Sequence, residues 1–553
     1  MSFVEIPADS DFTLANIPFG IFSTVSNPTP RACTAIGDYV LDLSSLSSTV
    51  FPKVLEKPDE ICEALRKTTL NAFAALGKTA RVAVRNAVLE VVKVGSEWQG
   101  LVEGALVKRG DARMHLPMDI GDYTDFYAGK NHAFNVGVLF RGPANALQPN
   151  YTHLPVGYHG RASTVVVSGT PLRRPLGQTC PPTNSTPNFD QCNRLDIELE
   201  MACYVSRPNE MGHPIDIKDA EDHIFGYSLM NDWSARDIQA WEYVPLGPFN
   251  AKNFGTTVGG WIVTDEALEG FRTAQMEGGG EVLPYLRDEK RGGKGVFDVE
   301  LEVLVKPAGQ EEFTKVFTSN SKNLLFSFSQ MIAHHTITGC AMRTGDLLGS
   351  GTISGADKTS VGSYLEATQG GKEDIEINGV KRKWLEDGDE VVLRGHAGSG
   401  AGRVGFGECS GLILPAEWGR WSKIAGAKKD HPPPTDSYTT ERQLSNIPYL
   451  LLQIQESSGK QETEENMAIL SDTEHPAQQQ QLTLTLEQAT ALEAAMAEGS
   501  LRGKKRVTRG SVVGEAGESL FKPGYEISSA AGQGFMSPRI SPGQKMQVFG
   551  NGI

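Results

Sequence analysis

The sequence predicts a mainly β fold of the α+β type, arranged in more than one domain. Sixty glycines and thirty prolines in 553 residues indicate frequent turns. The apolar runs are short and bounded by Gly or Pro, which is typical of strands rather than of long helices. At roughly 150 residues per domain, the length gives an expectation of about three or four domains. The predicted strands are residues 164–168, 195–205, 223–230, 297–305, 390–393 and 411–414.

Changes in composition divide the chain into three predicted regions, 1–117, 118–416 and 417–553. The first region begins with a predicted hairpin over 31–43, whose turn is Gly37-Asp38. It continues with apolar residues at near-helical spacing from Asp59 onward, which predicts a helix there. The second region is the longest and carries almost all of the candidate chemistry.

The third region, 417–553, has a composition that is typical of disorder. It contains three consecutive prolines at 432–434, a run of four glutamines and few aromatic residues. Such a segment cannot bury enough apolar surface to offset the entropy of the chain, so we expect it to be mostly disordered. One local helix start is predicted where Thr485 and Gln488 form a capping-box pattern. We interpret the basic cluster 504–506 as solvated charge rather than as a nuclear signal.

The charge and cysteine content exclude several classes of protein. The chain carries 52 basic and 67 acidic residues, a formal net charge of −15, which argues against binding to nucleic acid. The N-terminus is acidic, and no apolar run reaches about 18 residues, so neither a secretory signal nor a membrane span is predicted. Seven scattered cysteines without a Cys-x-x-Cys spacing indicate free thiols. We therefore expect a cytoplasmic protein that binds neither nucleic acid nor membrane.

Acidic and apolar residues alternate strictly over 195–201. On a strand this spacing places Asp196, Glu198 and Glu200 on one face and the apolar side chains on the other. The simplest interpretation is an amphipathic strand with a hydrated face. Three like charges on one face repel one another unless a cation lies between them, so a divalent-cation site is an equal alternative.

A further acidic residue, Asp232, follows the predicted strand 223–230, where a ligand can project from a rigid element. The pattern after it is helical and places Arg236, Gln239 and Tyr243 at positions i, i+3 and i+7, on one face. A guanidinium, an amide and a phenol in one row suit an oxygen-rich anion. An ordinary polar surface helix would show the same pattern.

Upstream, Asp125 and His132 are seven residues apart, which is two turns if this segment is helical. A carboxylate and a proton acceptor could then reach one pocket, although a lone histidine is more often structural. The combined candidate ligands have oxygen donors only, which suits Ca²⁺ or Mg²⁺ better than Zn²⁺. These ligands are Asp125, Glu198, Glu200 and Asp232.

Five runs in the second region are long and distinctive: GDYTDFY (121–127), HLPVGYHGRAS (153–163), NDWSARDIQ (231–239), WEYVPLGPF (241–249) and SGTISG (350–355). Together they closely resemble the fumarylacetoacetate hydrolase family, and the resemblance covers about 1–416. It implies a small N-terminal SH3-like barrel domain followed by a larger mixed β-roll that holds the site. It also implies a homodimer with the site near the interface.

The resemblance implies roles for individual side chains. His132 would be the general base, and Glu366 would orient it. The implied donors to the oxyanion and to the leaving enolate are Arg236, Gln239 and Lys252. The implied substrate contacts are Tyr127, Arg141, Tyr158, Gln239, Tyr243 and Thr352. The implied cation ligands are the four carboxylates above, with a second cation near Asp232, Lys252 and Thr256.

The activity implied by the resemblance is the cation-dependent hydrolysis of a carbon–carbon bond in 4-fumarylacetoacetate, a 1,3-diketo acid. The products would be fumarate and acetoacetate, at the end of tyrosine and phenylalanine breakdown. One alternative is an acylpyruvate hydrolase or oxaloacetate decarboxylase of the same superfamily, against which the N-terminal domain and Tyr127, Arg141 and Tyr243 argue. Another is a cation-binding scaffold without catalysis.

Three weaker signals are rejected. Residues 400–405 match Gly-x-Gly-x-x-Gly, but a strand rather than a helix is predicted after them, so no helix would face a pyrophosphate. No Gly-x-Ser-x-Gly motif occurs, which argues against an ordinary serine hydrolase. The pair His334-His335 lies in an apolar stretch and is interpreted as packing or surface rather than as a metal site.

Overall fold

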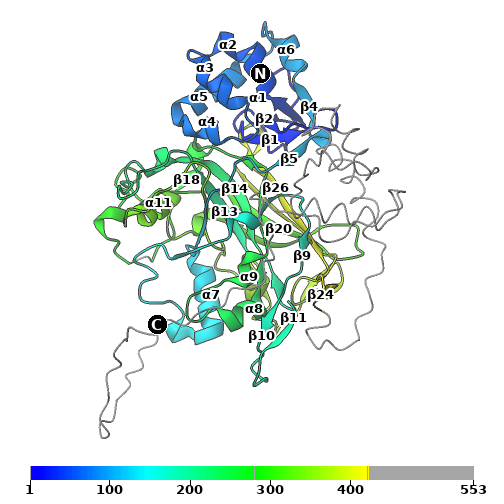
Figure 1. The fold of residues 1–553 in the computed structure, drawn as a ribbon, viewed down its shortest axis with the longest axis vertical. Helices are drawn as coiled ribbons and strands as arrows, with labels where there is room; N and C mark the ends of the chain where they lie inside the picture. Colours follow the sequence, from blue (N-terminus) through cyan, green and yellow to red (C-terminus); the bar gives the residue numbers. More distant parts are fainter. Residues whose placement is uncertain (1, 279, 420, 422–553) are drawn as a thin grey trace, which may run out of the picture. The chain divides into compact units, whose positions relative to one another are not determined.

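The computed structural model describes residues 2–278, 280–419 and 421 of the chain. Most of the third predicted region lies outside these residues, and with it the expected disorder, the predicted helix start at Thr485 and the basic cluster 504–506. Within the described residues the protein is mainly β with some helices, as predicted. The N-terminal part forms a distinct domain, drawn in blue in Figure 1.

The N-terminal domain combines a sheet with short helices. Its strands are β1 (Phe19–Ser23), β2 (Arg31–Ile36), β3 (Tyr39–Asp42), β4 (Leu106–Lys108) and β5 (Arg113–His115). Its helices are α1 (Leu43–Thr49), α2 (Phe51–Val54), α3 (Pro58–Leu65), α4 (Asn71–Ala75), α5 (Lys78–Val91) and α6 (Gln99–Glu103).

The predicted hairpin is confirmed, since β2 and β3 pair antiparallel with Ile36 opposite Tyr39. Gly37 in its turn has a φ of +56°, and a Cβ there would lie 2.4 Å from the carbonyl oxygen of Glu5. The turn therefore requires glycine. The helical periodicity from Asp59 forms two helices, α3 and α4, which are separated by turn and bend residues over 66–70.

The second part is built on two larger sheets. The first has the strand order β7-β6-β22-β13-β14-β16-β8, and the second has the order β21-β20-β25-β26-β9. The bounds of the first are β7 (Gly157–His159), β6 (Tyr123–Phe126), β22 (Leu347–Gly349), β13 (Leu199–Val205), β14 (Ile224–Asp232), β16 (Thr256–Val258) and β8 (Val165–Val167). Those of the second are β21 (Thr314–Asn320), β20 (Glu300–Lys306), β25 (Glu390–Ala397), β26 (Val404–Leu414) and β9 (Leu172–Arg173).

Shorter elements complete this part. The short strands are β10 (Leu176–Thr179), β11 (Asn188–Gln191), β12 (Leu195–Asp196), β15 (Ser234–Ala235), β17 (Trp261–Ile262), β18 (Arg272–Thr273), β19 (Val296–Phe297), β23 (Ile375–Ile377) and β24 (Val380–Arg382). The helices are α7 (Lys130–Arg141), α8 (Arg236–Glu242), α9 (Asn250–Asn253), α10 (Asp265–Leu268), α11 (Phe328–Thr336) and α12 (Tyr364–Ala367). Every predicted strand segment overlaps an observed strand. Residues 400–402 form a single 3₁₀ turn and β26 begins at Val404, so a strand rather than an α-helix follows the Gly-x-Gly-x-x-Gly run, as predicted.

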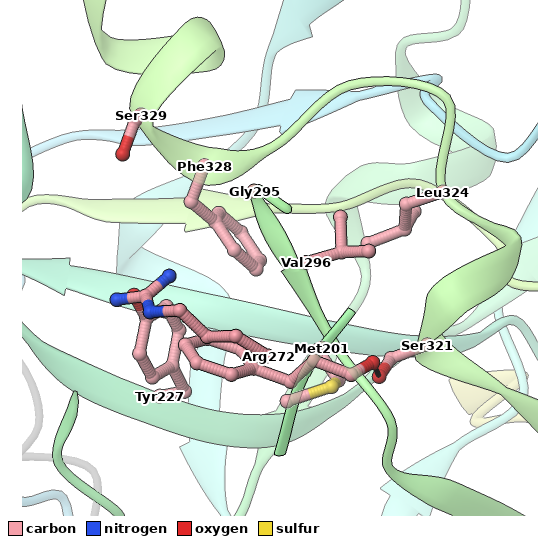
Figure 2. Close-up of a pocket in the computed structure, with 10 residues that line it drawn as sticks. Met201, Tyr227, Arg272, Gly295, Val296, Ser321, Leu324, Phe328 and Ser329 are labelled. Carbon is pink, nitrogen blue, oxygen red and sulfur yellow. Dashed lines mark hydrogen bonds between the residues drawn. The ribbon is translucent and has the colours of Figure 1, made fainter. Parts of the chain in front are cut away.

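The predicted strand over 195–201 is interrupted. It forms β12 and then β13, with Ile197 and Glu198 between them, and at this break the side chain of Asn231 accepts the N–H of Glu198 at 3.1 Å. The interpretation of 195–201 as a strand with a hydrated face is wrong, since every residue of this segment is buried. On the apolar side Met201 borders a hollow of about 10 Å³, room for roughly one water molecule (Figure 2).

The sheet of the N-terminal domain is completed by a strand from much later in the chain. Short β17 pairs antiparallel with β1, with Ile262 opposite Phe19 and Trp261 opposite Gly20. A Cβ on Gly20 would lie 2.9 Å from both the carbonyl oxygen of Gly260 and the ring of Trp261. Glycine at this position therefore permits the close approach of the two segments.

No helix among the described residues is long and apolar enough to cross a membrane. The seven cysteines all lie in the described part, and none forms a disulfide, which confirms the predicted free thiols. His334 and His335 lie in α11, where they contact the Tyr285 hydroxyl at 3.0 Å and the Thr124 hydroxyl at 2.9 Å. The prediction of a packing role for this pair agrees with these contacts.

A buried arginine joins the N-terminal domain to the sheet that carries the site. Arg81 of α5 is 1% exposed and donates to the carbonyl oxygens of Ile224 at 2.9 Å and Phe225 at 2.7 Å, at the start of β14. It also makes a two-point contact with the carboxylate of Glu266, at 2.9 and 3.0 Å. Because one guanidinium bonds both to the start of β14 and to Glu266, Arg81 holds α5 and β14 in one arrangement.

Replacement of Arg81 by Met should lower the apparent free energy of unfolding by about 3 kcal/mol, because two buried carbonyl oxygens and one carboxylate lose their partner. Urea unfolding followed by fluorescence would measure the change. The control is Arg394→Met, which breaks the exposed pair of Arg394 with Glu408. That variant should lose less than about 1 kcal/mol, and equal losses in the two variants would contradict the interpretation.

Candidate functional site

Four acidic side chains that are distant in the sequence meet in the second part of the protein. One carboxylate oxygen from each lies within 4.8 Å of the others, and all four residues are buried. Asp125 comes from β6, Glu200 from β13 and Asp232 from the last position of β14, while Glu198 comes from the break before β13. The structure thus brings the whole predicted ligand set together, and within the described residues no other such group is found.

The carboxylates of this acidic cluster differ in their electrostatic surroundings. Burial and the neighbouring charge of Asp232 raise the pKa of Asp125 well above its usual range. Burial and the charge of Asp125 raise the pKa of Glu200 in the same way. Burial would also raise the pKa of Glu198, but Lys252, Arg236 and His132 together outweigh it and lower that pKa to about 2. Glu198 is therefore held ionised, whereas its neighbours favour a bound proton or a cation.

Two buried cations account for the ionised state of Glu198. The ammonium of Lys252 donates to Glu198 and, at 2.5 Å, to Asp232. The guanidinium of Arg236 lies on the other oxygen of Glu198, with Nη2 2.8 Å from Oε1. Charge-assisted contacts of this kind are the strong ones in a buried setting.

The acidic cluster fits a hard divalent cation. Oδ1 of Asp125 and Oε1 of Glu200 are buried and have no hydrogen-bond partner among the described residues. Buried carboxylate oxygens without a partner are costly unless a positive charge reaches them. Because all the donors are oxygens, the set suits Ca²⁺ or Mg²⁺ rather than Zn²⁺. The cluster could therefore bind a metal ion.

A histidine–glutamate pair lies beside the acidic cluster. Nδ1 of His132 is 2.6 Å from Oε2 of Glu366, and Nε2 of the same ring is 3.8 Å from Oε1 of Glu198. Both residues are buried. Burial raises the pKa of Glu366, but the charge and hydrogen bond of His132 and further hydrogen bonds outweigh it, so this pKa is lowered. An ionised Glu366 accepts a hydrogen bond from Nδ1–H, so in the neutral ring Nε2, which lies on the side of Glu198, is the acceptor atom.

The proximity of Asp125 and His132 has a different origin from the predicted one. The segment is not one helix: Asp125 lies on β6, and His132 lies in the first turn of α7 after a short connection. A helix over 125–132 is therefore wrong, because Tyr123–Phe126 pairs with β22 and β7 in the sheet. The two side chains still reach one pocket.

A cavity of about 350 Å³ opens beside the acidic cluster and the histidine. Predicted site residues supply much of its lining: Asp125, Tyr127, His132, Arg141, Tyr158, Glu198, Glu200, Arg236, Gln239, Tyr243, Lys252 and Thr352. The remaining wall is partly apolar and includes Val136, Phe140 and Leu246. Arg236 donates to the side-chain oxygen of Gln239 at 3.1 Å, as the i, i+3 spacing predicts.

Three predicted residues lie behind this lining. Glu366 contacts His132, and Asp232 accepts from the hydroxyl of Tyr158 at 2.8 Å and from that of Thr256 at 3.2 Å. The ammonium of Lys252 is a positive charge and cannot ligate a cation, so only its carbonyl oxygen could serve a second cation near Asp232.

Several residues around the site were not predicted. Glu366 also accepts hydrogen bonds from the side chains of Asn135, Ser354 and Ser363, at 2.8 to 2.9 Å. The spacing of Ser363 and Glu366 is a capping-box pattern, and Ser363 does cap α12. That pattern could have found Ser363, and the i, i+3 spacing from His132 could have found Asn135.

Comparison with known proteins agrees with this arrangement. Residues 123–410 match the family described as fumarylacetoacetate (FAA) hydrolase, C-terminal, and residues 15–117 match fumarylacetoacetase, N-terminal. The chain belongs to the fumarylacetoacetate hydrolase family. All of the candidate cation ligands and the histidine–glutamate pair lie inside the C-terminal match.

The matches to relatives in this family extend over nearly the whole length of each relative. The chain is 56% identical to fumarylacetoacetase of Emericella nidulans over 427 residues, which are 75% of this chain and 98% of that protein. It is 47% identical to fumarylacetoacetase of Homo sapiens over 423 residues, 75% of this chain and 99% of that protein. It is 45% identical to fumarylacetoacetase of Arabidopsis thaliana over 421 residues, 75% of this chain and 98% of that protein.

Cation binding to the acidic cluster should release protons and should strengthen as the pH rises. The raised pKa values of Asp125 and Glu200 favour protonated carboxyls in the absence of a cation, whereas a cation binds the deprotonated forms. Affinity should therefore fall as the pH is lowered through these raised values. Calorimetric titration with Ca²⁺ in two buffers of different ionisation enthalpy would measure both the affinity and the proton release.

Replacement of Glu200 by Gln should weaken Ca²⁺ binding by at least about tenfold, because one charged ligand is lost. It should also reduce the number of protons released. Asp265→Asn is the matched control: Asp265 is equally buried but contacts Tyr227 and Arg272 instead of the acidic cluster. An unchanged affinity in Glu200→Gln, or an equal loss in the control, would contradict the assignment.

Proposed function

We propose that this protein hydrolyses a carbon–carbon bond of 4-fumarylacetoacetate to give fumarate and acetoacetate, the last step of tyrosine and phenylalanine breakdown. The observation that carries the proposal is the acidic cluster beside the His132–Glu366 pair, in a cavity of a member of this family. Relatives up to 56% identical are named fumarylacetoacetase. The chain covers 98 to 99% of the length of the fumarylacetoacetases of Emericella nidulans, Homo sapiens and Arabidopsis thaliana, so both of the family's regions are represented.

The chemistry requires a water nucleophile at one carbonyl group and a leaving carbon that can bear negative charge. In a 1,3-diketone the leaving carbon becomes an enolate, which is far more stable than a simple carbanion. A divalent cation held by Asp125, Glu198, Glu200 and Asp232 would polarise the diketone oxygens and stabilise the enolate charge when bound.

His132 acts as the general base in this proposal. Its Nδ1–H is fixed by Glu366, so Nε2 can take a proton from water as the water oxygen bonds to the carbonyl carbon. When the carbon–carbon bond breaks, its electron pair leaves with the departing carbon as the enolate, and this carbon takes up the proton that His132 received from water. Glu366 stabilises the imidazolium that exists between the two proton transfers. The side chains of Asn135, Ser354 and Ser363 donate to Glu366 and hold it in place. General-base help is typically worth about 10²–10⁴-fold in rate.

Donors around the cavity would stabilise the developing oxyanion and hold the substrate. Arg236, Gln239 and Lys252 are the proposed donors to the oxyanion and the enolate, a type of contact worth about 10²–10³-fold each. The hydroxyl of Thr352 is buried without a partner among the described residues, so it is free to bind the substrate. The other proposed substrate contacts are Tyr127, Arg141, Tyr158, Gln239 and Tyr243.

A second cation near Asp232, Lys252 and Thr256 also belongs to the proposal.

Exposed apolar side chains support a homodimer with the site near the interface, since Phe140, Tyr243 and Leu246 line the cavity and further exposed apolar residues neighbour them in the sequence. Contiguous exposed apolar patches mark interaction surfaces, and Phe140 and Tyr243 approach to 6.3 Å between ring centroids. The exposed residues of this apolar rim are Phe140, Trp241, Tyr243, Val244, Leu246 and Phe249. We further propose the domain boundaries at about 117 and 416, the SH3-like barrel and the β-roll that the resemblance implies. Seven free thiols support a reducing compartment, the cytoplasm.

Replacement of His132 by Ala should lower kcat on fumarylacetoacetate by about 10²–10⁴-fold, because the general base is lost, while Ca²⁺ affinity is retained. Loss of the ultraviolet absorbance of the substrate would measure turnover. The control His153→Ala removes an exposed imidazole outside the cavity lining and should turn over normally. A cation-binding scaffold predicts no turnover in any variant, and turnover that survives exhaustive chelation would reject the role of the cation.

Replacement of Phe249 by Glu should convert the dimer to a monomer, because a charge would be buried in an apolar interface. Light scattering after size-exclusion chromatography would measure the mass. The control Val25→Glu changes a fully exposed apolar residue of the N-terminal domain and should leave the dimer intact. A dimer in both variants would place the interface elsewhere, and a monomeric unmodified protein would reject the homodimer.

A further inference from the structure

Asp196 belongs to the alternating acidic run but not to the acidic cluster. Its side chain is fully buried and does not line the cavity. Four donors surround it: Oδ1 accepts the N–H groups of Ile197 at 2.8 Å and Tyr364 at 2.7 Å, and Oδ2 accepts that of Leu365 at 3.0 Å and Nε–H of Arg236 at 2.8 Å. A buried carboxylate with this many donors is a fixed point in its surroundings.

The contact with Arg236 fixes one catalytic side chain. Arg236 uses Nε for Asp196, Nη1 for Gln239 at 3.1 Å and Nη2 for Glu198 at 2.8 Å. A guanidinium is planar, so holding Nε on one side determines where the two Nη groups point on the other. Asp196 therefore sets the orientation of the donor edge that faces Glu198 and the cavity.

The contacts with Tyr364 and Leu365 fix a second catalytic group. These two residues begin α12, the short helix that also carries Glu366. Their backbone N–H groups converge on one carboxylate, so the position of α12 is tied to that of Asp196. The oxygen that His132 contacts therefore depends on the same anchor as the guanidinium of Arg236.

We propose that Asp196 is a positioning residue. It fixes the position of Arg236 relative to that of the turn that carries Glu366. The proposal rests on the proposed function, since it concerns the same site. Asp196 touches neither the cavity nor the acidic cluster, and it acts only through these two partners. An asparagine in its place keeps one acceptor oxygen, but its amide group faces either Arg236 and Leu365 or Tyr364 and Ile197, donor against donor.

The test measures kcat and KM on fumarylacetoacetate for the full chain and three variants: Asp196→Asn, Arg236→Gln and the double variant. Asp196→Asn should lower kcat by about 10²-fold, because a misplaced catalytic group commonly costs that much, with KM changed much less. Because Asp196 acts partly through Arg236, the double variant should fall short of the product of the two single losses by at least about tenfold. Losses that multiply in full, or a kcat for Asp196→Asn close to that of the unmodified protein, would overturn the proposal.

The matched control is Asp389→Asn, since Asp389 is also fully buried and also accepts from one arginine, together with two backbone N–H groups where Asp196 has three. Asp389 does not line the cavity. The Tm of Asp389→Asn should therefore fall by about as much as that of Asp196→Asn, while its kcat is preserved. An equal loss of kcat in Asp389→Asn would reduce Asp196 to a general stabilising role and overturn the proposal.

Crystal structures of the two single aspartate variants provide a readout that needs no substrate. In Asp196→Asn the guanidinium should leave its contact with Glu198, and in Asp389→Asn that contact should remain. Retention of the contact in Asp196→Asn would overturn the positioning role. If the unmodified protein failed to hydrolyse fumarylacetoacetate, the proposed function would fall while these structures still decided the role of Asp196.

Discussion

The repulsion among four buried carboxylates is the constraint on which the rest of the site depends. Their oxygens lie within 4.8 Å of one another and away from water, an arrangement that is unfavourable without compensating positive charge. The sheet holds them together by placing three on strands that are paired over several residues. Lys252 and Arg236 compensate part of the negative charge, and the remaining oxygens suit a divalent cation.

The positive charge of Lys252 and Arg236 is shared unequally among the carboxylates, so the carboxylates differ in how readily they ionise. Glu198 receives both protein cations, and its pKa is lowered to about 2 by its protein neighbours alone. Asp125 and Glu200 receive neither as a direct partner, so a bound cation would be needed to favour their charged forms. A site built in this way has an ionised carboxylate permanently beside His132 and a cation-binding capacity that is coupled to protonation.

The sequence predicted most of the site but not the path by which its residues meet. Alternation over 195–201 identified Glu198 and Glu200. It could not show that the strand is interrupted where the side chain of Asn231 accepts the N–H of Glu198, nor that Asp196 contacts Arg236. Such an interruption depends on a residue on the neighbouring strand, which spacing alone does not reveal. The mainly β character followed from turn residues and short apolar runs, whereas the extent of helix in the N-terminal domain reflects local packing that no single periodic pattern carried.

The pairing of β17 with β1 has a consequence for synthesis of the chain. The stretch of β1 at Phe19 and Gly20 lacks its partner until Trp261 and Ile262 have been translated. At about 5–20 residues per second the ribosome takes on the order of ten seconds or more to reach them. During that interval an edge of the first domain is open to other strands, so the nascent protein must avoid intermolecular pairing there before its own later segment arrives.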